Sequence, residues 1–265
     1  MEREKKRRLV LVHGACHGAW CWYKVAALLK SNGHQVTALD MAASGIHPKQ
    51  VHDLNSISEY FEPLMYFLGS LPTEERVILV GHSFGGACIS VAMEMFPTKI
   101  AAAVFVAAWM PSPDLSFSTL LQEFQYSRIM ESDLHSKITF DENTSNHRNG
   151  SRMFGPQFLA SKLYQLSPPE DLTLAMSLLR PTRIYGDVEL LRENTRLTKD
   201  NYGTVAKAYL VCEQDNVLRK DFQLSMIERN PPNEVKVIVG ADHMPMFSKP
   251  QELFSYLQEI ANTYY

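Results

Sequence analysis

The stretch Gly81-His82-Ser83-Phe84-Gly85 decides how this chain is interpreted. It fits the pattern G-x-S-x-G and lies between the apolar run 76–80 and a small-residue segment, which predicts a sharp turn from a strand into a helix. Such a turn has no room for side chains at its flanks, so its glycines let the backbone close while Ser83 projects its hydroxyl from the sheet edge. The helix N-terminus adds a positive dipole and free N–H groups, which favour an oxyanion. The stretch therefore predicts a nucleophile elbow, and an ordinary glycine turn is the alternative.

A serine hydroxyl is a weak nucleophile at neutral pH, so this prediction requires a histidine base and an acid that orients it. In this class of elbow the acid and then the histidine follow the serine along the chain, each after a later strand. The apolar run 206–212 ends shortly before Asp215, and the run 234–239 ends shortly before His243. We therefore expect Ser83 as nucleophile, His243 as base and Asp215 as the orienting acid.

Three other carboxylates compete with Asp215. Glu213 would point to the opposite side of a local extension from Gln214. Asp242 adjoins the histidine in sequence, which is poor geometry for orienting its ring. Asp40 also ends a strand but precedes the serine, so we interpret it as a turn residue beside the site.

An oxyanion hole needs one N–H after the nucleophile and another from the loop after the first core strand. That loop is His13-Gly14-Ala15-Cys16-His17-Gly18-Ala19-Trp20, whose glycines and alanines allow backbone amides to approach a substrate carbonyl closely. We expect Ala15 and Phe84 as the two donors. The alternative is a glycine turn that leads into the next helix.

Apolar runs alternate with helical patterns, which predicts an α/β fold with a mostly parallel sheet and helices on both faces. Strands are predicted at 9–13, 35–40, 76–82, 102–108, 206–212 and 234–239, and helices at 21–32, 57–69, 85–96, 219–229 and 249–262. Between 111 and 188 the rhythm changes to amphipathic stretches, a polar loop at 141–151 and helical patterns around 156–165 and 168–179. We expect a single domain, with a core of 1–110 and 189–265 and a mainly helical cap inserted at 111–188 that roofs the nucleophile.

Composition limits the partners. The chain has 265 residues, is 45% hydrophobic and carries a net charge of −3, so it can bury a large core and gives no electrostatic reason to expect nucleic acid or acidic membranes. No apolar leader pattern and no long apolar span occur, which predicts a cytoplasmic protein without a membrane span. The four cysteines lack metal-ligand spacing, and a mechanism of serine, histidine and acid needs neither a metal nor an organic cofactor, so none is expected.

Six stretches together resemble a known family. They are His13–Trp20, Thr37-Ala38-Leu39-Asp40 with Ala42-Ala43-Ser44-Gly45-Ile46, Gly81–Gly86, Phe154-Gly155-Pro156, Tyr164-Gln165-Leu166-Ser167-Pro168 and Gly240-Ala241-Asp242-His243-Met244. Over essentially its whole length the chain resembles the plant methylesterases of the α/β-hydrolase superfamily and their hydroxynitrile lyase and methylketone synthase relatives. The resemblance implies the same serine, histidine, acid and oxyanion donors. It also implies methyl esters of small hydrophobic acids as substrates, of the plant-hormone type such as methyl jasmonate, methyl salicylate and methyl indole-acetate.

Two positions favour an esterase over a lyase. The best-known lyases that resemble this chain carry threonine where Gly14 stands and lysine where Met244 stands, and cyanohydrin cleavage needs a cation to hold the departing cyanide. Methylketone synthase relatives replace the serine with alanine and the acid with asparagine, whereas this chain keeps both Ser83 and Asp215. Likeness to that branch leaves β-keto acyl chains open as substrates.

A hydroxynitrile lyase and a non-catalytic protein that binds a small acid remain the alternative functions. The family resemblance also leaves a homodimer open, although the sequence contains no interface signal. Six residues are expected to contact the substrate in its pocket: Gly14, His17, His82, Met153, Phe154 and Met244.

Overall fold

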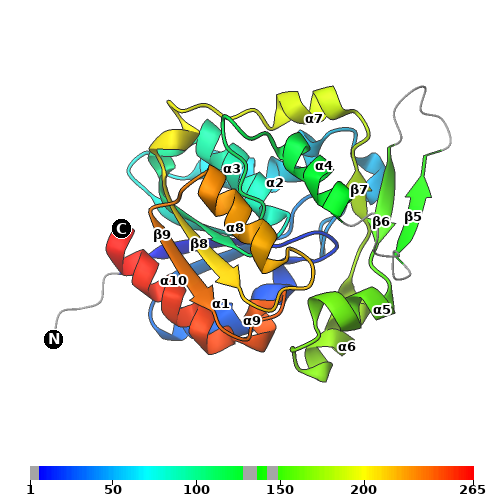
Figure 1. Ribbon diagram of the computed structural model, residues 1–265. Helices are drawn as coiled ribbons and strands as arrows, with labels where there is room; N and C mark the ends of the chain where they lie inside the picture. The colour runs from blue at the N-terminus through cyan, green and yellow to red at the C-terminus, as the bar shows by residue number, and fades with distance from the viewer. Residues whose placement is uncertain (1–5, 128–135, 142–148) are drawn as a thin grey trace.

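A computed structural model of the chain describes residues 6–127, 136–141 and 149–265. Its centre is a six-stranded sheet in the order β2-β1-β3-β4-β8-β9, in which every neighbouring pair is parallel (Figure 1). The strands are β1 (Arg8–Val12), β2 (Gln35–Leu39), β3 (Val77–His82), β4 (Ile100–Val106), β8 (Ala206–Cys212) and β9 (Glu234–Ile238). The predicted α/β fold is confirmed, and the bounds of these strands differ from the predicted ones by at most two residues.

Helices cover both faces of the sheet because successive strand residues point to opposite sides. In β1, Val10 and Val12 pack with α2 (Ile57–Ser70), α3 (Gly85–Met95) and α8 (Lys220–Arg229) in one core. Leu9 and Leu11 pack with α1 (Tyr23–Ser31), α9 (Pro245–Ser248) and α10 (Pro250–Tyr264) in the other. Figure 1 shows these two groups of helices on opposite sides of the sheet. The continuous apolar runs of the sequence therefore correspond to strands that are buried on both faces.

The strand order decides where a ligand can bind. β1 lies between β2 and β3, and the chain leaves β1 toward one face of the sheet but leaves β3 toward the other. In open parallel sheets this reversal creates a crevice at the carboxyl ends of the strands. The loops after β1, β3, β8 and β9 all lie at that edge, so residues that are far apart in the sequence become neighbours there.

The segment between β4 and β8 contains more than helices. It includes α4 (Phe117–Ser127), α5 (Pro156–Phe158), a π-helical turn (Leu159–Leu163), α6 (Pro169–Leu178) and α7 (Val188–Asn194). It also contains an antiparallel sheet of β5 (Lys137–Phe140), β6 (Gly150–Met153) and β7 (Thr182–Ile184), which the sequence analysis missed. Strands of three or four residues are too short to show a clear alternation of apolar and polar residues. The polar loop predicted at 141–151 lies mostly outside the described residues, and its last two residues belong to β6.

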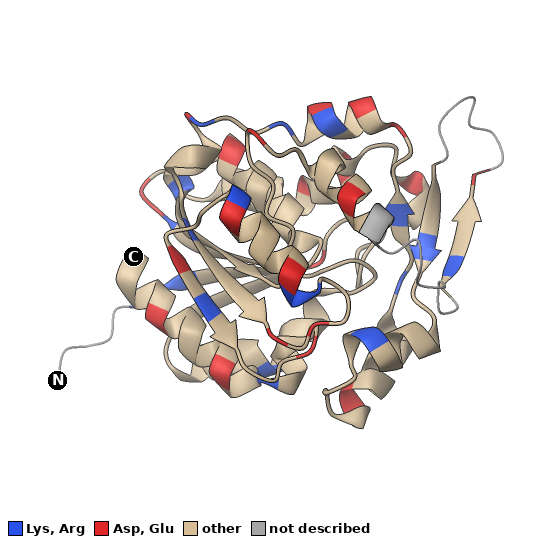
Figure 2. Ribbon diagram, viewed as in Figure 1, with Lys and Arg blue, Asp and Glu red and all other residues tan. Residues whose placement is uncertain are grey.

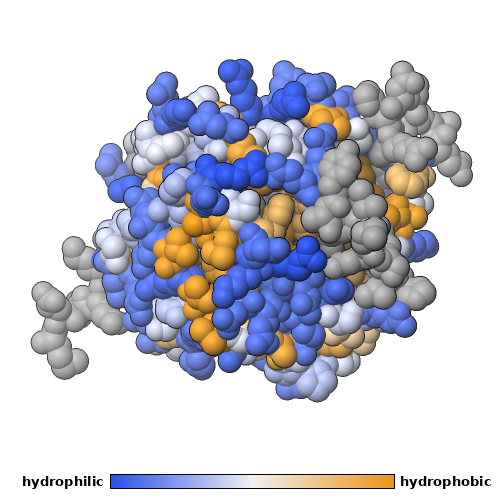
Figure 3. Space-filling model, in the orientation of Figure 1, coloured by the Kyte–Doolittle hydropathy of each residue, from blue (hydrophilic) through white to orange (hydrophobic). Residues whose placement is uncertain are grey.

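Charged residues lie mainly on the outer helices and loops, with acidic and basic groups interspersed (Figure 2). The face shown in Figure 3 is mostly hydrophilic, with smaller hydrophobic groups between. Across the part of the chain that the structure describes, no helix combines the length and apolar character needed to cross a membrane.

Two helical glycines give a matched test of this packing. A Cβ atom on Gly85, at the start of α3, would lie 2.7 Å from the carbonyl oxygen of Val12 and 2.8 Å from that of His13. A Cβ on Gly69 in α2 would meet nothing closer than the Phe96 ring at 4.0 Å. We expect Gly85→Ala to lower the free energy of unfolding by about 1–3 kcal/mol, because α3 must move off β1. Gly69→Ala should cause no loss, since alanine stabilises a helix by roughly 0.5–1 kcal/mol relative to glycine. Denaturant titration checks both, and equal stability of the two variants would contradict this account.

Candidate active site

Ser83 occupies the strained turn that the sequence predicted. Its φ is 52°, in the left-handed region, directly between β3 and α3. A Cβ on Gly81 would lie 2.8 Å from the carbonyl oxygen of Gly85, so the turn excludes a side chain there. Hydrogen bonds hold the strained residue, since its N–H donates to Val106 and its carbonyl accepts from the N–H of Trp109. A backbone held in this region at a cost of about 1–3 kcal/mol is typical of functional sites.

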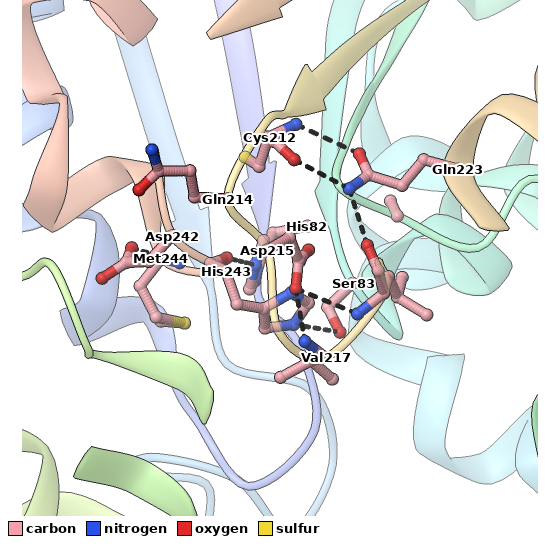
Figure 4. A network of polar contacts seen from close by, with 12 residues as sticks. His82, Ser83, Cys212, Gln214, Asp215, Val217, Gln223, Asp242, His243 and Met244 are labelled. Carbon is pink, nitrogen blue, oxygen red and sulfur yellow. Dashed lines mark hydrogen bonds and ion pairs between the residues drawn. The ribbon is translucent and has the colours of Figure 1, made fainter. Parts of the chain in front are cut away.

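The structure brings Ser83, His243 and Asp215 into one hydrogen-bonded line, as Figure 4 shows. Nδ1 of His243 lies 2.7 Å from Oδ2 of Asp215, and Nε2 lies 3.0 Å from Oγ of Ser83. A carboxylate only accepts hydrogen bonds, so Nδ1 carries the proton and Nε2 is left to accept from the serine hydroxyl. All three residues are buried, and Ser83 is the most accessible of them at 9% exposure.

Asp215 is held on its second oxygen as well. Oδ1 accepts from the N–H groups of Val217 and Leu218, at 2.6 and 3.0 Å. Burial raises the pKa of Asp215, while His243 and these two N–H groups act in the opposite direction. Asp215 is buried, and the three groups that donate hydrogen bonds to its oxygens favour the ionised form of its carboxyl group.

The competing carboxylates have other partners. Glu213 accepts from Lys220 and from the N–H of Gly240. Asp40 accepts from the N–H groups of Ala19 and Ile46 in the turn after β2. The third competitor, Asp242, is fully buried, and its carboxylate accepts hydrogen bonds from backbone N–H groups and serine hydroxyls.

The loop after β1 places Ala15 beside Ser83. Ala15, Ser83 and Phe84 line the same cavity, and among the described residues the N–H groups of Ala15 and Phe84 donate to no protein acceptor. The peptide between Gly14 and Ala15 is held by His13, whose Nε2 accepts from a backbone N–H and whose Nδ1 donates to the carbonyl of Gly14 at 2.8 Å. A Cβ on Gly14 would lie 2.9 Å from Cβ of Ser83, so glycine permits this close approach. The two N–H groups are thus available to a ligand oxygen near Ser83.

Two further histidines hold the surrounding loops. Nδ1 of His17 lies 2.8 Å from the carbonyl of Ala15, and its Nε2 lies 2.7 Å from the hydroxyl of Tyr164. Nε2 of His82 donates to the carbonyl of His243 at 2.7 Å. Burial lowers the pKa of His17 to about 3 and that of His82 well below its ordinary value, so both rings are neutral at pH 7.

A cavity of about 610 Å³ opens beside Ser83. Aromatic and aliphatic side chains from the cap (residues 111–188) and from the loops after β4 and β8 supply most of its wall. The lining residues besides Ala15, Ser83 and Phe84 are Trp109, Phe117, Leu121, Phe124, Gln125, Arg152, Phe154, Phe158, Lys162, Thr182, Arg183, Ile184, Tyr185, Leu191, Val217 and Leu218. An apolar wall with a few polar groups is typical of a small-molecule site.

Of the six residues predicted to contact the substrate, only Phe154 lines this cavity. His17 and His82 instead bond to the loops that surround the nucleophile, and Met244 is fully buried in the core under α9. Gly14 abuts Ser83 without reaching the cavity, and Met153 is not among its lining residues either. Adjacency in sequence to the reacting groups was a poor guide, because much of the wall comes from the cap.

The sequence did contain one signal for the missed residues. Phe117, Leu121 and Phe124 recur at helical spacing along α4, and they form one apolar wall of the cavity. Trp109 and Leu218 follow strands without any such pattern, so only the assembled structure identifies them.

The neutral histidines make stability depend on pH. An imidazole whose pKa is lowered by folding binds a proton more readily in the unfolded chain, so stability is lost as the pH falls below the ordinary value of 6.5. Burial lowers the pKa of His13 as well, so three rings contribute. We expect the free energy of unfolding to decrease between about pH 7 and pH 5, at up to about 1.4 kcal/mol per pH unit for each ring.

Denaturant titrations between pH 5 and pH 7 measure how steeply the free energy of unfolding changes with pH. His17→Gln removes one of the three rings and should flatten the dependence, whereas His52→Gln, on an exposed side chain, should keep the wild-type slope. A wild-type stability that does not change across the range would contradict the lowering of the pKa of these three rings by folding.

Comparison with known proteins agrees with the fold. A model described as the alpha/beta hydrolase family matches residues 9–255. Methyl jasmonate esterase 1 from Vitis vinifera is 56% identical over 261 residues, which cover 98% of this chain and 99% of that protein. Methylesterase 3 from Arabidopsis thaliana is 46% identical over 264 residues, 99% of each chain. The crystal structure of tomato methylketone synthase I complexed with 2-tridecanone has a TM-score of 0.92 at 46% identity and covers 99% of this chain and 100% of that one. The chain therefore belongs to the alpha/beta hydrolase family and, within it, to the plant methylesterases.

Proposed function

We propose that this chain hydrolyses methyl esters of small hydrophobic carboxylic acids, with Ser83, His243 and Asp215 as its catalytic triad. The observation that carries the proposal is the hydrogen-bonded line of these three side chains, which ends at Ser83 in the wall of a largely apolar cavity. Methylesterases among its relatives support the same reaction.

Each group has a distinct role in the reaction. His243 takes the hydroxyl proton at Nε2 while Oγ of Ser83 attacks the ester carbon. The carbonyl oxygen becomes an oxyanion, which accepts from the N–H groups of Ala15 and Phe84. His243 then gives its proton to the leaving methanol. A water molecule repeats these steps on the acyl-enzyme and releases the acid.

Asp215 acts on the histidine throughout both steps. Its hydrogen bond fixes the tautomer with the proton on Nδ1, and its charge stabilises the imidazolium that forms when Nε2 takes the second proton. The N–H groups of Val217 and Leu218 keep the carboxylate in place.

The cavity wall favours hydrophobic acyl groups. Phe117, Phe124, Phe154 and Phe158 line it, and a cavity of about 610 Å³ is in the range that holds a small organic acid. Methyl jasmonate is our first candidate, because a relative with 56% identity is named for it. Methyl salicylate and methyl indole-acetate have the same chemical character. Methyl esters of β-keto acids form the second class, supported by the likeness to a methylketone synthase structure that contains 2-tridecanone.

Replacing the nucleophile tests the reaction directly. We expect Ser83→Ala to lower kcat on every methyl ester by on the order of 10⁴ or more, because no alcohol remains to be acylated. The variant should still bind the free acid, since the cavity wall is unchanged. Methanol release measures the first effect and calorimetry the second, and esterase activity close to wild type would refute the role of Ser83.

A matched pair of acidic residues tests the orienting role. Asp215→Asn should lower kcat by on the order of 10⁴, because the amide favours the wrong histidine tautomer. Glu213→Gln, two residues earlier, should leave kcat within a few-fold of wild type, since Glu213 bonds to Lys220 and Gly240. Steady-state kinetics on one methyl ester compares them. Equal losses in the two variants would count against Asp215.

A further inference from the structure

Four consecutive residues, Tyr164-Gln165-Leu166-Ser167, form hydrogen bonds to three loops at the carboxyl edge of the sheet, those after β1, β8 and β9. We call them the cap latch. The hydroxyl of Tyr164 lies 2.7 Å from Nε2 of His17 in the loop after β1. Nε2 of Gln165 donates to the carbonyl of Gln214, which directly precedes Asp215, at 2.7 Å.

The remaining two latch residues bond to the loop after β9. The N–H of Leu166 and the hydroxyl of Ser167 both donate to Oδ2 of Asp242, at 3.0 and 2.8 Å. Asp242 directly precedes His243. The latch therefore bonds to the residues that directly precede Asp215 and His243.

Asp242 joins the latch to the rest of its own loop. Its Oδ1 accepts from the N–H of Met244 at 2.9 Å and from the hydroxyl of Ser248 at 2.8 Å. Each oxygen thus accepts one backbone N–H and one serine hydroxyl, and the side chain is fully buried. A carboxylate that is fully buried with four donors and no cation among the described residues is costly to form. A role in positioning explains why such a group stands beside His243.

Two of the three loops are also hydrogen-bonded to each other directly, and the third is joined to them through Tyr164. The N–H of Gln214 donates to the carbonyl of Ala241 at 2.9 Å, which ties the loop of Asp215 to that of His243. His17, which Tyr164 holds, bonds to the carbonyl of Ala15. The ring of Tyr164 is buried and stacks on Phe247 of α9, so the latch is itself fixed.

We propose that Asp242 is a positioning residue for the reaction and that the cap latch, by bonding to it and to the two other loops, sets the alignment of Ser83, Asp215 and His243. The cap then does more than enclose the substrate. Detaching the latch should misalign the reacting groups even for an ester too small to need the cavity. The inference rests on the proposed esterase function for its main readout.

Asparagine at position 242 cannot reproduce these bonds. Each oxygen of Asp242 faces one fixed backbone N–H, from Leu166 on one side and Met244 on the other. The amide NH₂ of asparagine is a donor, so either orientation opposes one of these N–H groups. Asp242→Asn must therefore release either the latch or the loop of His243.

The experiment compares Asp242→Asn, Ser167→Ala and Ser167→Thr with a cap control, Ser177→Ala. The hydroxyl of Ser177 is exposed and bonds within α6. Steady-state kinetics are measured on a methyl ester and on 4-nitrophenyl acetate, whose acyl group is small. Because displacements of about 1 Å can cost up to about 10²-fold, we expect Asp242→Asn to lower kcat about 10–100-fold on both esters, with KM within about threefold of wild type.

The Ser167 pair separates the hydroxyl from the rest of the side chain. Ser167→Ala should lower kcat about 3–10-fold on both esters, and Ser167→Thr, which keeps the hydroxyl, should restore it to within about twofold. The Ser177→Ala control should match wild type. If Asp242→Asn does not fold, as judged by its thermal denaturation, the Ser167 pair alone decides.

Two results would overturn the inference. One is unchanged kcat in folded Asp242→Asn or in Ser167→Ala. The other is a raised KM on the methyl ester with normal kinetics on 4-nitrophenyl acetate, which would reduce the latch to a substrate-binding role.

The rate of covalent labelling of Ser83 by a fluorophosphonate gives an independent readout. If wild type hydrolyses no methyl ester, the proposed function fails, whereas slower labelling of Asp242→Asn than of wild type would still support the positioning role.

Discussion

The hydrogen bond between Asp215 and His243 is the interaction on which the site depends. It joins two buried groups that come from different strands, and it determines which nitrogen of the histidine faces Ser83. Burying a carboxylate is costly, and here two backbone N–H groups and the imidazole offset that cost. The neighbouring His17 and His82 are kept neutral by burial, so they add no positive charge near the imidazolium that the proposed reaction forms.

Asp215 and His243 can form this hydrogen bond because β8 and β9 are parallel neighbours, so the loops that follow these strands lie at the same edge of the sheet. Parallel strands deliver the loops after β1, β3, β8 and β9 to one edge, and the reversal of strand order beside β1 opens the crevice there. The glycines around Ser83 let α3 approach β1 to within backbone contact, which holds Ser83 at a positive φ. The strain at Ser83 is thus maintained by the same packing that stabilises the core.

In our proposals the cap has two roles: it selects the acyl group of the substrate, and it aligns the reacting side chains. Helix α4 and the short cap strands supply much of the cavity wall, so the cap selects the acyl group by shape and apolar contact. The cap latch, in contrast, makes four hydrogen bonds to the loops around the reacting groups, and the ring of Tyr164 stacks on Phe247. A change in the cap that alters the acyl preference without touching the latch would leave the alignment intact.

The amino-acid sequence by itself determined the fold and selected the three side chains of the hydrogen-bonded line. Continuous apolar strands, helical periodicity and the G-x-S-x-G turn are local signals, because each reflects the packing of neighbouring residues along the chain. Only the tertiary structure decided the cavity wall, the short cap sheet and the partners of Asp242. Asp242 is adjacent to the histidine and poorly placed to orient its ring, and nothing along the chain indicates its bonds to Leu166 and Ser167, which lie 76 and 75 positions away. Contacts of this kind depend on how the cap is laid over the sheet, and no periodicity along the chain records that placement.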